Sequence, residues 1–377
     1  MTVITCQPNF PKGEIFPGYR NRLFQRETIE GIHVIRVWSY ISANEGFFKR
    51  TLDFMSYAFM AFWAGLFAKA DVIIATSPQF FTTVAGGLLA KVKRTPWIME
   101  VRDLWPESIK AVGALSGESP TYRMLERLEL WLYRQAQGIV VVTEAFRDNL
   151  MRRGVPDEKI HVIKNGVDLS RFRPQPKDQD LLDELELNGK FVIGYIGTHG
   201  MAHALDFVLE AAAACENEDI HILLLGDGAE KQRLLQLHEQ LNLSNVTMLP
   251  FVAKSEVNRY ISILDAALVN LKKSDTFKTV IPSKIFENAA LLKPILLGVE
   301  GESQAIIEAF RAGLTFEPEN QADFLSRASE LYQNRTNYVT LQEGCARLAK
   351  AFDRKELARR MLRTVEEIVP VRDPRTY

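Results

Sequence analysis

Cysteine is scarce in this sequence of 377 residues. The three cysteines, Cys6, Cys215 and Cys345, are far apart and odd in number. They form no Cys-x-x-Cys pair and no Cys/His cluster, so the sequence offers neither a zinc site nor a disulfide framework. We therefore expect the protein to work in a reducing compartment, the cytoplasm, and without a bound metal.

A strong net charge and low-complexity segments are also missing. The formal charge is −1 at pH 7 and 47% of the residues are hydrophobic, a composition typical of a folded enzyme. The first 170 residues carry a slight excess of basic side chains and the remainder a slight excess of acidic ones. This imbalance is too small to indicate nucleic acid as a partner. No basic segment precedes the apolar residues after Met1, so we expect no signal peptide.

The length suits two α/β domains of similar size. Short apolar runs rich in β-branched residues alternate with helical patterns, at 3–4, 33–37, 72–75, 97–101 and 139–142, then at 191–196, 221–225, 246–249, 266–269 and 294–297. This alternation predicts an α/β protein with two doubly wound, Rossmann-like domains facing a cleft. A segment with Gly and Pro but no periodicity, 165–177, is the predicted linker. The predicted domains are 1–170 and 171–355, followed by a C-terminal helix and tail, 356–377, that could return to the first domain.

The segment 47–70 has an unusual composition. Fifteen uncharged residues, many of them aromatic, run from Phe54 to Ala68, with basic residues on both sides. The run is too short to span a bilayer. Two interpretations remain open, a buried crossover helix under the first sheet and an interfacial helix that holds the protein on a membrane.

Glycines follow the apolar run 191–196. Gly197, Thr198 and Gly200 would form a loop between this strand and a helix predicted at 204–214. Glycine lets a diphosphate approach the backbone, and a helix N-terminus offers N–H groups and the positive end of the helix dipole. The same corner is also a common packing device in α/β folds, so the motif alone does not decide.

Two further loops come from neighbouring strands of the second domain. Gly226-Asp227-Gly228 lies one βα unit further on and could belong to the same crevice. Asn245 to Phe251 would be a strand whose end meets a nucleotide base, or a plain buried strand.

The segment 281–290 places Ser283, Lys284 and Glu287 at the start of a helix, and Lys284 and Glu287 lie on one face of it. A carboxylate can bind both hydroxyls of a ribose, and an ammonium can neutralise a leaving diphosphate. The alternative is an ordinary surface Lys–Glu pair.

Taken in order, these motifs resemble a known family. Tyr-Ile-Gly-Thr-His-Gly at 195–200, Leu-Leu-Gly-Asp-Gly at 224–228, Asn-Val-Thr at 245–247, Pro-Ser-Lys-Ile-Phe-Glu at 282–287 and Gly-Glu-Ser at 301–303 resemble the donor domain of glycosyltransferase family 4, which has the GT-B fold. Asn-Gly-Val-Asp at 165–168 resembles the interdomain signature of that family. The segment 101–108 is similar to a subgroup that builds O-antigen and capsular polysaccharide, including N-acetylfucosamine transferases. The resemblance extends from Thr2 to about Val369.

The resemblance implies a role for each motif. Glu287 would hold the ribose and Lys284 the diphosphate, whereas Thr279 stands where the family has a further acid and Met201 where it often has a basic residue. The predicted nucleotide-sugar site comprises Gly197, Thr198, Gly200, Asp227, Phe251, Ser283, Lys284 and Glu287. The predicted acceptor side comprises Arg102, Asp103 and Glu107, and the predicted catalytic residues are Asp103 and Lys284.

The implied activity is transfer of a sugar, with retention of configuration, from a nucleotide-sugar to a lipid-linked or saccharide acceptor. The expected donor is a UDP-linked N-acetyl amino sugar, the expected product is a surface polysaccharide such as O-antigen (lipopolysaccharide), and no metal or other cofactor is required. The enzyme would be cytoplasmic and peripheral at the inner face of the cell membrane. The alternatives are a sugar-nucleotide epimerase of the same fold and an inactive transferase that acts as a scaffold. An NAD enzyme is disfavoured because no Gly-x-Gly-x-x-Gly opens the chain.

The start of the chain also carries an expectation. Residues 1–6 resemble the second strand of a family 4 enzyme rather than its first. We therefore expect that the first strand–helix unit is absent here, and that a unit of roughly 30 to 40 residues precedes Thr2 in the working protein.

Overall fold

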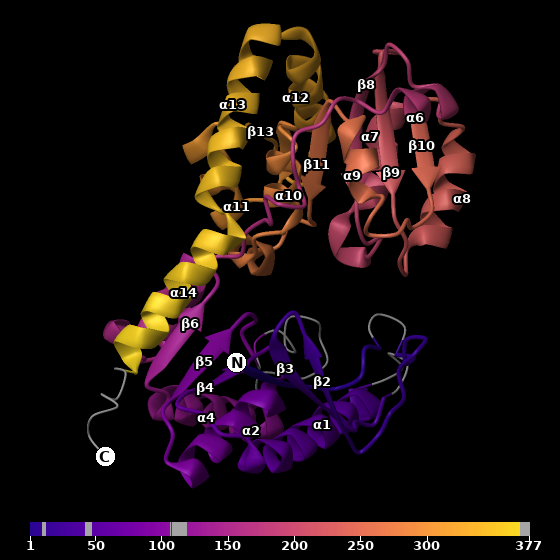
Figure 1. The fold of residues 1–377 in the computed structure, drawn as a ribbon. Helices are drawn as coiled ribbons and strands as arrows, with labels where there is room; N and C mark the ends of the chain where they lie inside the picture. Colours follow the sequence, from indigo (N-terminus) through magenta and orange to yellow (C-terminus); the bar gives the residue numbers. More distant parts are fainter. Residues whose placement is uncertain (10–12, 42–46, 106, 108–118, 370–377) are drawn as a thin grey trace. The chain divides into compact units, whose positions relative to one another are not determined.

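The computed structural model describes residues 1–9, 13–41, 47–105, 107 and 119–369 (Figure 1). The chain forms two compact units. Unit 1 comprises Met1–Ile163 together with the last turns of helix α14 (Arg354–Ile368), and unit 2 comprises Lys164–Arg360. The predicted linker 165–177 belongs to unit 2, because Val167 and Phe172 are buried in its core.

Unit 2 contains a fully parallel sheet of six strands in the order β10-β9-β8-β11-β12-β13. The strands are β8 (Phe191–Ile196), β9 (Ile220–Leu225), β10 (Val246–Leu249), β11 (Ala266–Asn270), β12 (Ile295–Gly298) and β13 (Gly313–Thr315). This is the doubly wound order 3-2-1-4-5-6. The order reverses between β8 and β11, and ligands of such sheets bind beyond the carboxyl ends of the strands at this point.

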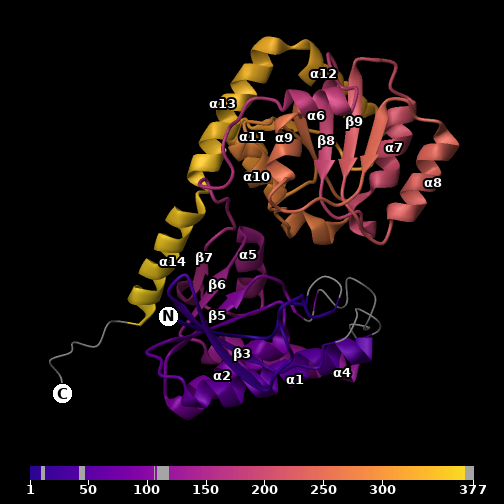
Figure 2. The same ribbon diagram turned by 45° about the vertical axis from the view of Figure 1, so that its right-hand side comes forward.

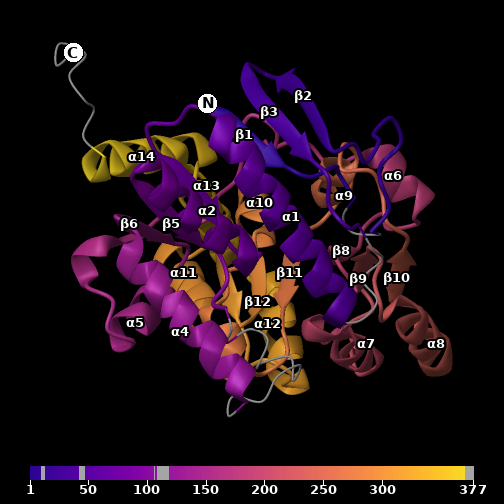
Figure 3. The ribbon, with the colours of Figure 1, turned by 90° about the horizontal axis from the view of Figure 1, so that it is seen from below.

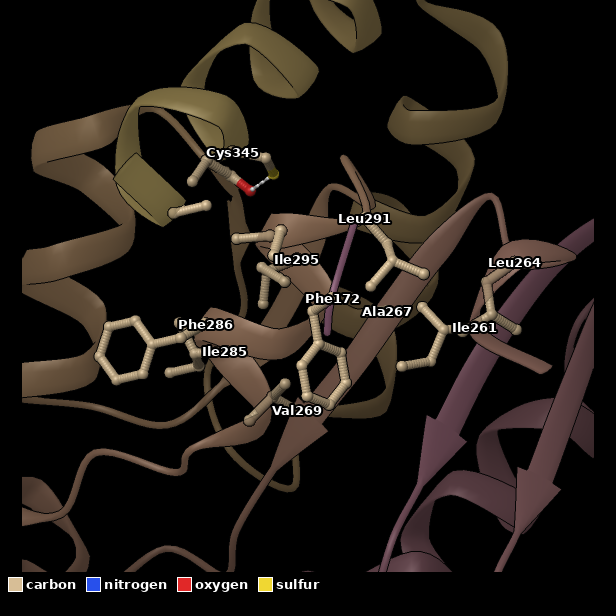
Figure 4. Close-up of a cluster of buried hydrophobic side chains, with 14 of the residues drawn as sticks. Phe172, Ile261, Leu264, Ala267, Val269, Ile285, Phe286, Leu291, Ile295 and Cys345 are labelled. Carbon is tan, nitrogen blue, oxygen red and sulfur yellow. Dashed lines mark hydrogen bonds between the residues drawn. The ribbon is translucent and has the colours of Figure 1, made fainter. Parts of the chain in front are cut away.

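Helices cover both faces of this sheet, as Figure 2 shows. One layer holds α9 (Val257–Ser262), α10 (Lys284–Ala290), α11 (Glu302–Phe310) and α13 (Arg335–Ala351), and the other α7 (Leu205–Ala213), α8 (Lys231–Leu241) and α12 (Gln321–Gln333). The short helix α6 (Gln179–Glu184) adds Leu181 and Leu182 to the first layer. Successive strand residues enter opposite cores, which explains why the strands are apolar at nearly every position. In β11, Ala267 and Val269 pack in the core of Figure 4, whereas Leu268 packs in the other.

Unit 1 contains two separate sheets rather than one. The first has the order β1-β3-β2, from β1 (Thr2–Thr5), β2 (Phe24–Ile29) and β3 (Ile32–Val37), and the second has the order β4-β5-β6-β7, from β4 (Ile73–Thr76), β5 (Trp97–Val101), β6 (Gly138–Val141) and β7 (Ile160–Val162). β2 and β3 form an antiparallel hairpin that turns at Glu30 and Gly31, and every other pairing is parallel. Within the described residues, β1 and β4 are both edge strands. That a further strand pairs with either edge stays a prediction.

Besides the last turns of α14, the α-helices of the described part of unit 1 are α1 (Phe47–Phe67), α2 (Phe80–Lys93), α4 (Pro120–Gln135) and α5 (Glu144–Arg152). Figure 3 looks onto α1, α2 and α4, which lie side by side. α1 packs on the first sheet, where the Tyr57 hydroxyl donates to the carbonyl oxygen of Ile4 at 2.8 Å. α1 also packs on α2, because Gly65 leaves room for Leu89. Of the helices described, none has the length and apolar character needed to cross a membrane.

Candidate functional site

Two glycine loops pack against each other at the carboxyl ends of β8 and β9. The amide of Gly197 donates to Leu225 O at 3.0 Å, and the amide of His199 donates to Asp227 O at 2.9 Å. A Cβ atom at Gly226 would overlap the carbonyl oxygen of Gly197, and one at Gly228 would lie 2.5 Å from His199 O. Loop packing therefore explains the glycines at 226 and 228, whereas a Cβ atom at Gly200 would contact no atom closer than 3.7 Å.

Lys284 lies beside the first of these loops. Its Nζ is 3.6 Å from the centre of the Tyr195 ring and would be 2.9 Å from a Cβ atom at Gly197. This ammonium is buried and has no hydrogen-bond partner among the described residues. Burial lowers its pKa to about 7, against a smaller opposing effect of Glu287. An unpaired buried cation is unfavourable, so the structure holds a group that an incoming anion would stabilise.

Two histidines surround the same tyrosine. The rings of His199 and His203 have their centres 6.0 and 5.7 Å from that of Tyr195. His199 is fully buried with both ring nitrogens unpaired, and the buried Nδ1 of His203 is also unpaired in the described part of the chain. Burial lowers the pKa of each imidazole to about 4, helped by the charges of Lys231 and Lys284 for His199 and by that of Lys284 for His203. Neither residue was predicted as part of the site, although their positions on either side of Gly200 indicated that they lie near this loop.

The helix predicted at 204–214 agrees with α7 to within one residue, but the turn before it was not predicted. A short 3-10 turn, Met201–His203, and Ala204 with a positive φ of 44° come first, and helix α7 begins only at Leu205. The Nδ2 atom of Asn270, at the end of β11, donates to His203 O at 2.6 Å. The turn is thus held by the strand on the other side of the switch point.

The other predicted donor residues lie on the same side of the sheet or at the start of α10. Glu287 is on α10, and no ion pair of its carboxylate is found within the described ranges. Ser283 is exposed at the N-cap, Phe251 is 71% exposed after β10, and the Asp227 carboxylate accepts from the amide of Gly228 at 2.8 Å. Thr279 is in a 3-10 helix, where its hydroxyl donates to Thr276 O at 3.0 Å.

The predicted acceptor residues follow β5 in unit 1. Ser77 Oγ accepts from the amide of Arg102 at 3.1 Å and donates to Asp103 O at 3.2 Å. Arg102 also pairs with Glu100, and Glu107 accepts from Asn149 Nδ2 at 3.1 Å. These contacts hold the loop in place. Pro106 and Ser108 of the predicted motif lie outside the described residues.

Among the residues that the structure describes, no group of three or more His, Cys, Asp or Glu side chains could hold a metal ion. Metal-independent activity stays a prediction.

Comparison with known proteins identifies the family. A model described as "Glycosyl transferase 4-like domain" matches residues 1–166, and one described as "Glycosyl transferases group 1" matches residues 190–334. The probable glycosyltransferase WbjE of Pseudomonas aeruginosa is 26% identical over 74% of this chain and 74% of its own length. The putative colanic acid biosynthesis glycosyl transferase WcaI of Escherichia coli is 24% identical over 82% of this chain and 75% of its own.

Solved structures show the same fold at low sequence identity. The sucrose-phosphate synthase of Thermosynechococcus elongatus has a TM-score of 0.75 at 16% identity, over 97% of this chain and 88% of that one. Anabaena HepE in complex with UDP-glucose has a TM-score of 0.68 at 18% identity, over 83% and 82%. The chain belongs to the glycosyltransferases of the family 4 and group 1 type and is an enzyme with the GT-B fold.

Proposed function

We propose that unit 2 binds a nucleotide-sugar and that the enzyme transfers the sugar with retention of configuration. The buried, unpaired ammonium of Lys284 beside Gly197 carries this proposal. A diphosphate would supply the missing hydrogen-bond acceptors, and a charge-assisted hydrogen bond in a dry site is strong. As the bond between sugar and diphosphate breaks, negative charge builds on the departing phosphate, and an ammonium already in position stabilises it.

The other predicted residues would contact different parts of the nucleotide-sugar. The backbone of Gly197, Thr198 and Gly200 would contact the diphosphate. Packing does not require the glycine at 200, because a Cβ atom there would contact no atom closer than 3.7 Å. The carboxylate of Glu287 would accept from the two ribose hydroxyls. Asp227, Ser283 and Phe251 are the candidates for the rest of the nucleotide. In unit 1, Asp103 would orient the acceptor hydroxyl with Arg102 and Glu107 beside it.

A UDP-linked N-acetyl amino sugar is the proposed donor. Two similar folds support UDP, namely HepE in complex with UDP-glucose and the pneumococcal transferase GtfA in complex with UDP and GlcNAc. Relatives named for colanic acid and teichuronic acid biosynthesis support a surface polysaccharide as the product. We propose a lipid-linked or saccharide acceptor, as in O-antigen or capsule assembly, met by the enzyme at the inner face of the cell membrane through residues 47–70.

A donor screen tests the proposal. The melting temperature would be measured with UDP, GDP and dTDP and with their sugars, because a ligand that binds the folded state raises stability by mass action. We expect the largest rise with UDP and a UDP-N-acetylhexosamine, and release of UDP when a lipid-linked acceptor is added. No rise with any nucleotide would refute the site. Conversion of the donor into an epimer without an acceptor would indicate the epimerase instead.

A further inference from the structure

Helix α1 exposes an apolar stripe. Its exposed large side chains recur three or four residues apart and so lie on one face: Leu52, Met55, Phe59, Trp63 and Phe67. Phe59 is 62% exposed and Phe67 81%, whereas Ala64, beside the stripe, is buried against β3. The neighbouring helix α2 adds Leu88 and Val92, which are also exposed. Aromatic residues this exposed and this close together mark an interaction surface rather than ordinary solvent-facing positions.

The charges around this surface are mostly positive. Between residues 49 and 94 the basic residues are Lys49, Arg50, Lys69, Lys91, Lys93 and Arg94, whereas the acidic ones are Asp53 and Asp71 alone. Lys93 Nζ donates to Leu66 O at 3.0 Å, which ties the C-terminal ends of α1 and α2 together. An apolar stripe with cations at its ends is typical of a surface that lies in a membrane interface.

A pocket of about 350 Å³ opens at the C-terminal end of α2, between α2 and α4. Lys91, Arg94, Trp97, Trp131, Gln135 and Gln137 line it, and no carboxylate does. Within the described chain, neither Lys91 nor Arg94 has an ion-pair partner. The pocket is large enough for a small anionic group.

The pocket and the stripe lie on one helix pair. The pocket is lined by Lys91 and Arg94 at the end of α2, and the same helix exposes Leu88 and Val92, one turn apart, to the solvent. A free phosphate would use only the cations. A phospholipid uses both features, since its phosphate is anionic and its acyl chains are apolar.

We propose that the face formed by α1 and α2 docks on an anionic lipid bilayer and that the pocket between α2 and α4 binds the phosphate of a lipid headgroup. This proposal deepens the membrane contact of the proposed function. It is independent of the donor site in unit 2, because lipid binding is measured without sugar transfer.

Vesicle sedimentation tests the proposal with the intact chain. The vesicles contain phosphatidylcholine alone, or phosphatidylcholine and phosphatidylglycerol in equal parts. We expect the protein to bind the anionic vesicles at least about tenfold more tightly, since each basic residue near such a surface adds attraction. Two double variants, Lys91→Glu with Arg94→Glu and Phe59→Gln with Phe67→Gln, should each lose at least about tenfold of this binding.

Matched changes elsewhere provide the controls. Lys254→Glu with Lys350→Glu, both exposed in unit 2, and Val339→Gln, at a 54% exposed position of α13, should bind vesicles almost as the unchanged protein does. All substituted positions in the apolar pair are exposed, and cooperative melting at the original temperature confirms that each variant is folded.

A second measurement is made on the vesicle-bound protein and does not depend on a variant that loses binding. Brominated acyl chains should quench the fluorescence of Trp63, and the quenching should fall in Trp63→Phe. The proposal is overturned if the protein does not bind anionic vesicles, or if both double variants bind them as tightly as the unchanged protein does. Binding of inorganic phosphate to the pocket without any binding of vesicles also overturns it, because the ligand would then be a soluble anion.

Discussion

Replacing Lys284 by methionine should stabilise the free enzyme and abolish donor binding. Methionine keeps the length and most of the volume of the side chain and removes the buried charge. In the free enzyme the ammonium lies against the Tyr195 ring without a hydrogen-bond partner among the described residues. Burying this charge therefore lowers the free energy of unfolding of the free enzyme, and a bound anion restores it. The side chain reduces stability but favours binding.

The pKa of Lys284 gives the size and the pH dependence of this effect. Burial lowers the pKa from 10.5 to about 7. Between these values the unfolded chain holds a proton that the folded protein lacks, so the free energy of unfolding rises with pH across this window. At 1.36 kcal/mol per pKa unit, the buried Lys284 lowers the free energy of unfolding at pH 7 by an amount on the order of 4 kcal/mol. This is an upper bound, because the structure around the charge can relax.

Denaturation at about pH 7 and about pH 9 measures the stability change, because these values lie at the start and well inside the window. We expect Lys284→Met to be more stable near pH 7 and to lack the rise toward higher pH. Lys350→Met, at an exposed position of α13, is the control and should behave as the unchanged protein.

Calorimetry with a UDP-sugar measures binding. In the unchanged protein the affinity should be highest below about pH 7, where Lys284 is charged, and should fall as the pH rises above that value. A sugar nucleotide is used because it has no terminal phosphate that titrates near neutrality. The reasoning is refuted if Lys284→Met is less stable at pH 7, or if it binds the donor with unchanged affinity.

Four further predictions concern individual residues and the metal. Glu287→Ala should weaken nucleotide binding by about 1.5 to 3 kcal/mol, as for a hydrogen bond to a charged group, while Glu343→Ala on α13 has no effect. Gly226→Ala should lower the free energy of unfolding by about 1 to 3 kcal/mol, because its Cβ atom overlaps Gly197 O, whereas Gly200→Ala should leave the stability unchanged and weaken nucleotide binding. Activity should survive EDTA, and a requirement for added manganese would contradict this. Cys345 should resist thiol reagents in the folded protein, because burial raises the pKa of its thiol, and modification at the rate of Cys215 would be the contrary result.

The sequence was sufficient to predict most of unit 2. The apolar runs 191–196 and 221–225 match β8 and β9, because strands buried on both faces are apolar throughout. The order of the glycine loops and Lys284 predicted that they lie together, as the structure shows, and donor binding by them stays a prediction. The predicted start of the helix, residue 204, lies within one residue of the start of α7 at Leu205. The 3-10 turn before it was not predicted, since no local pattern indicates that Asn270 holds the backbone of His203 and Ala204.

Unit 1 was harder to predict. The hairpin strand β2 has an exposed face and mixed polarity, so its pattern is weak, and the division into two sheets depends on pairing between distant segments. The sequence also did not predict that His199 and His203 are buried, because histidine is intermediate between typical surface and typical core residues. For segment 47–70, the structure confirms a helix that packs on the first sheet through one face. The other face is exposed, and its contact with a membrane stays a prediction.

Unit 1 is formed by segments from both ends of the chain, which has a consequence for biosynthesis. Ile368 on α14 packs over Gly138, the first residue of β6, and a side chain at that glycine would overlap it. The ribosome delivers this isoleucine only after all of unit 2 has been made. The surface of β6 that Ile368 covers therefore stays uncovered until α14 has been made, even when the rest of unit 1 has folded. A chaperone that shields apolar surface on the nascent chain would act longest there.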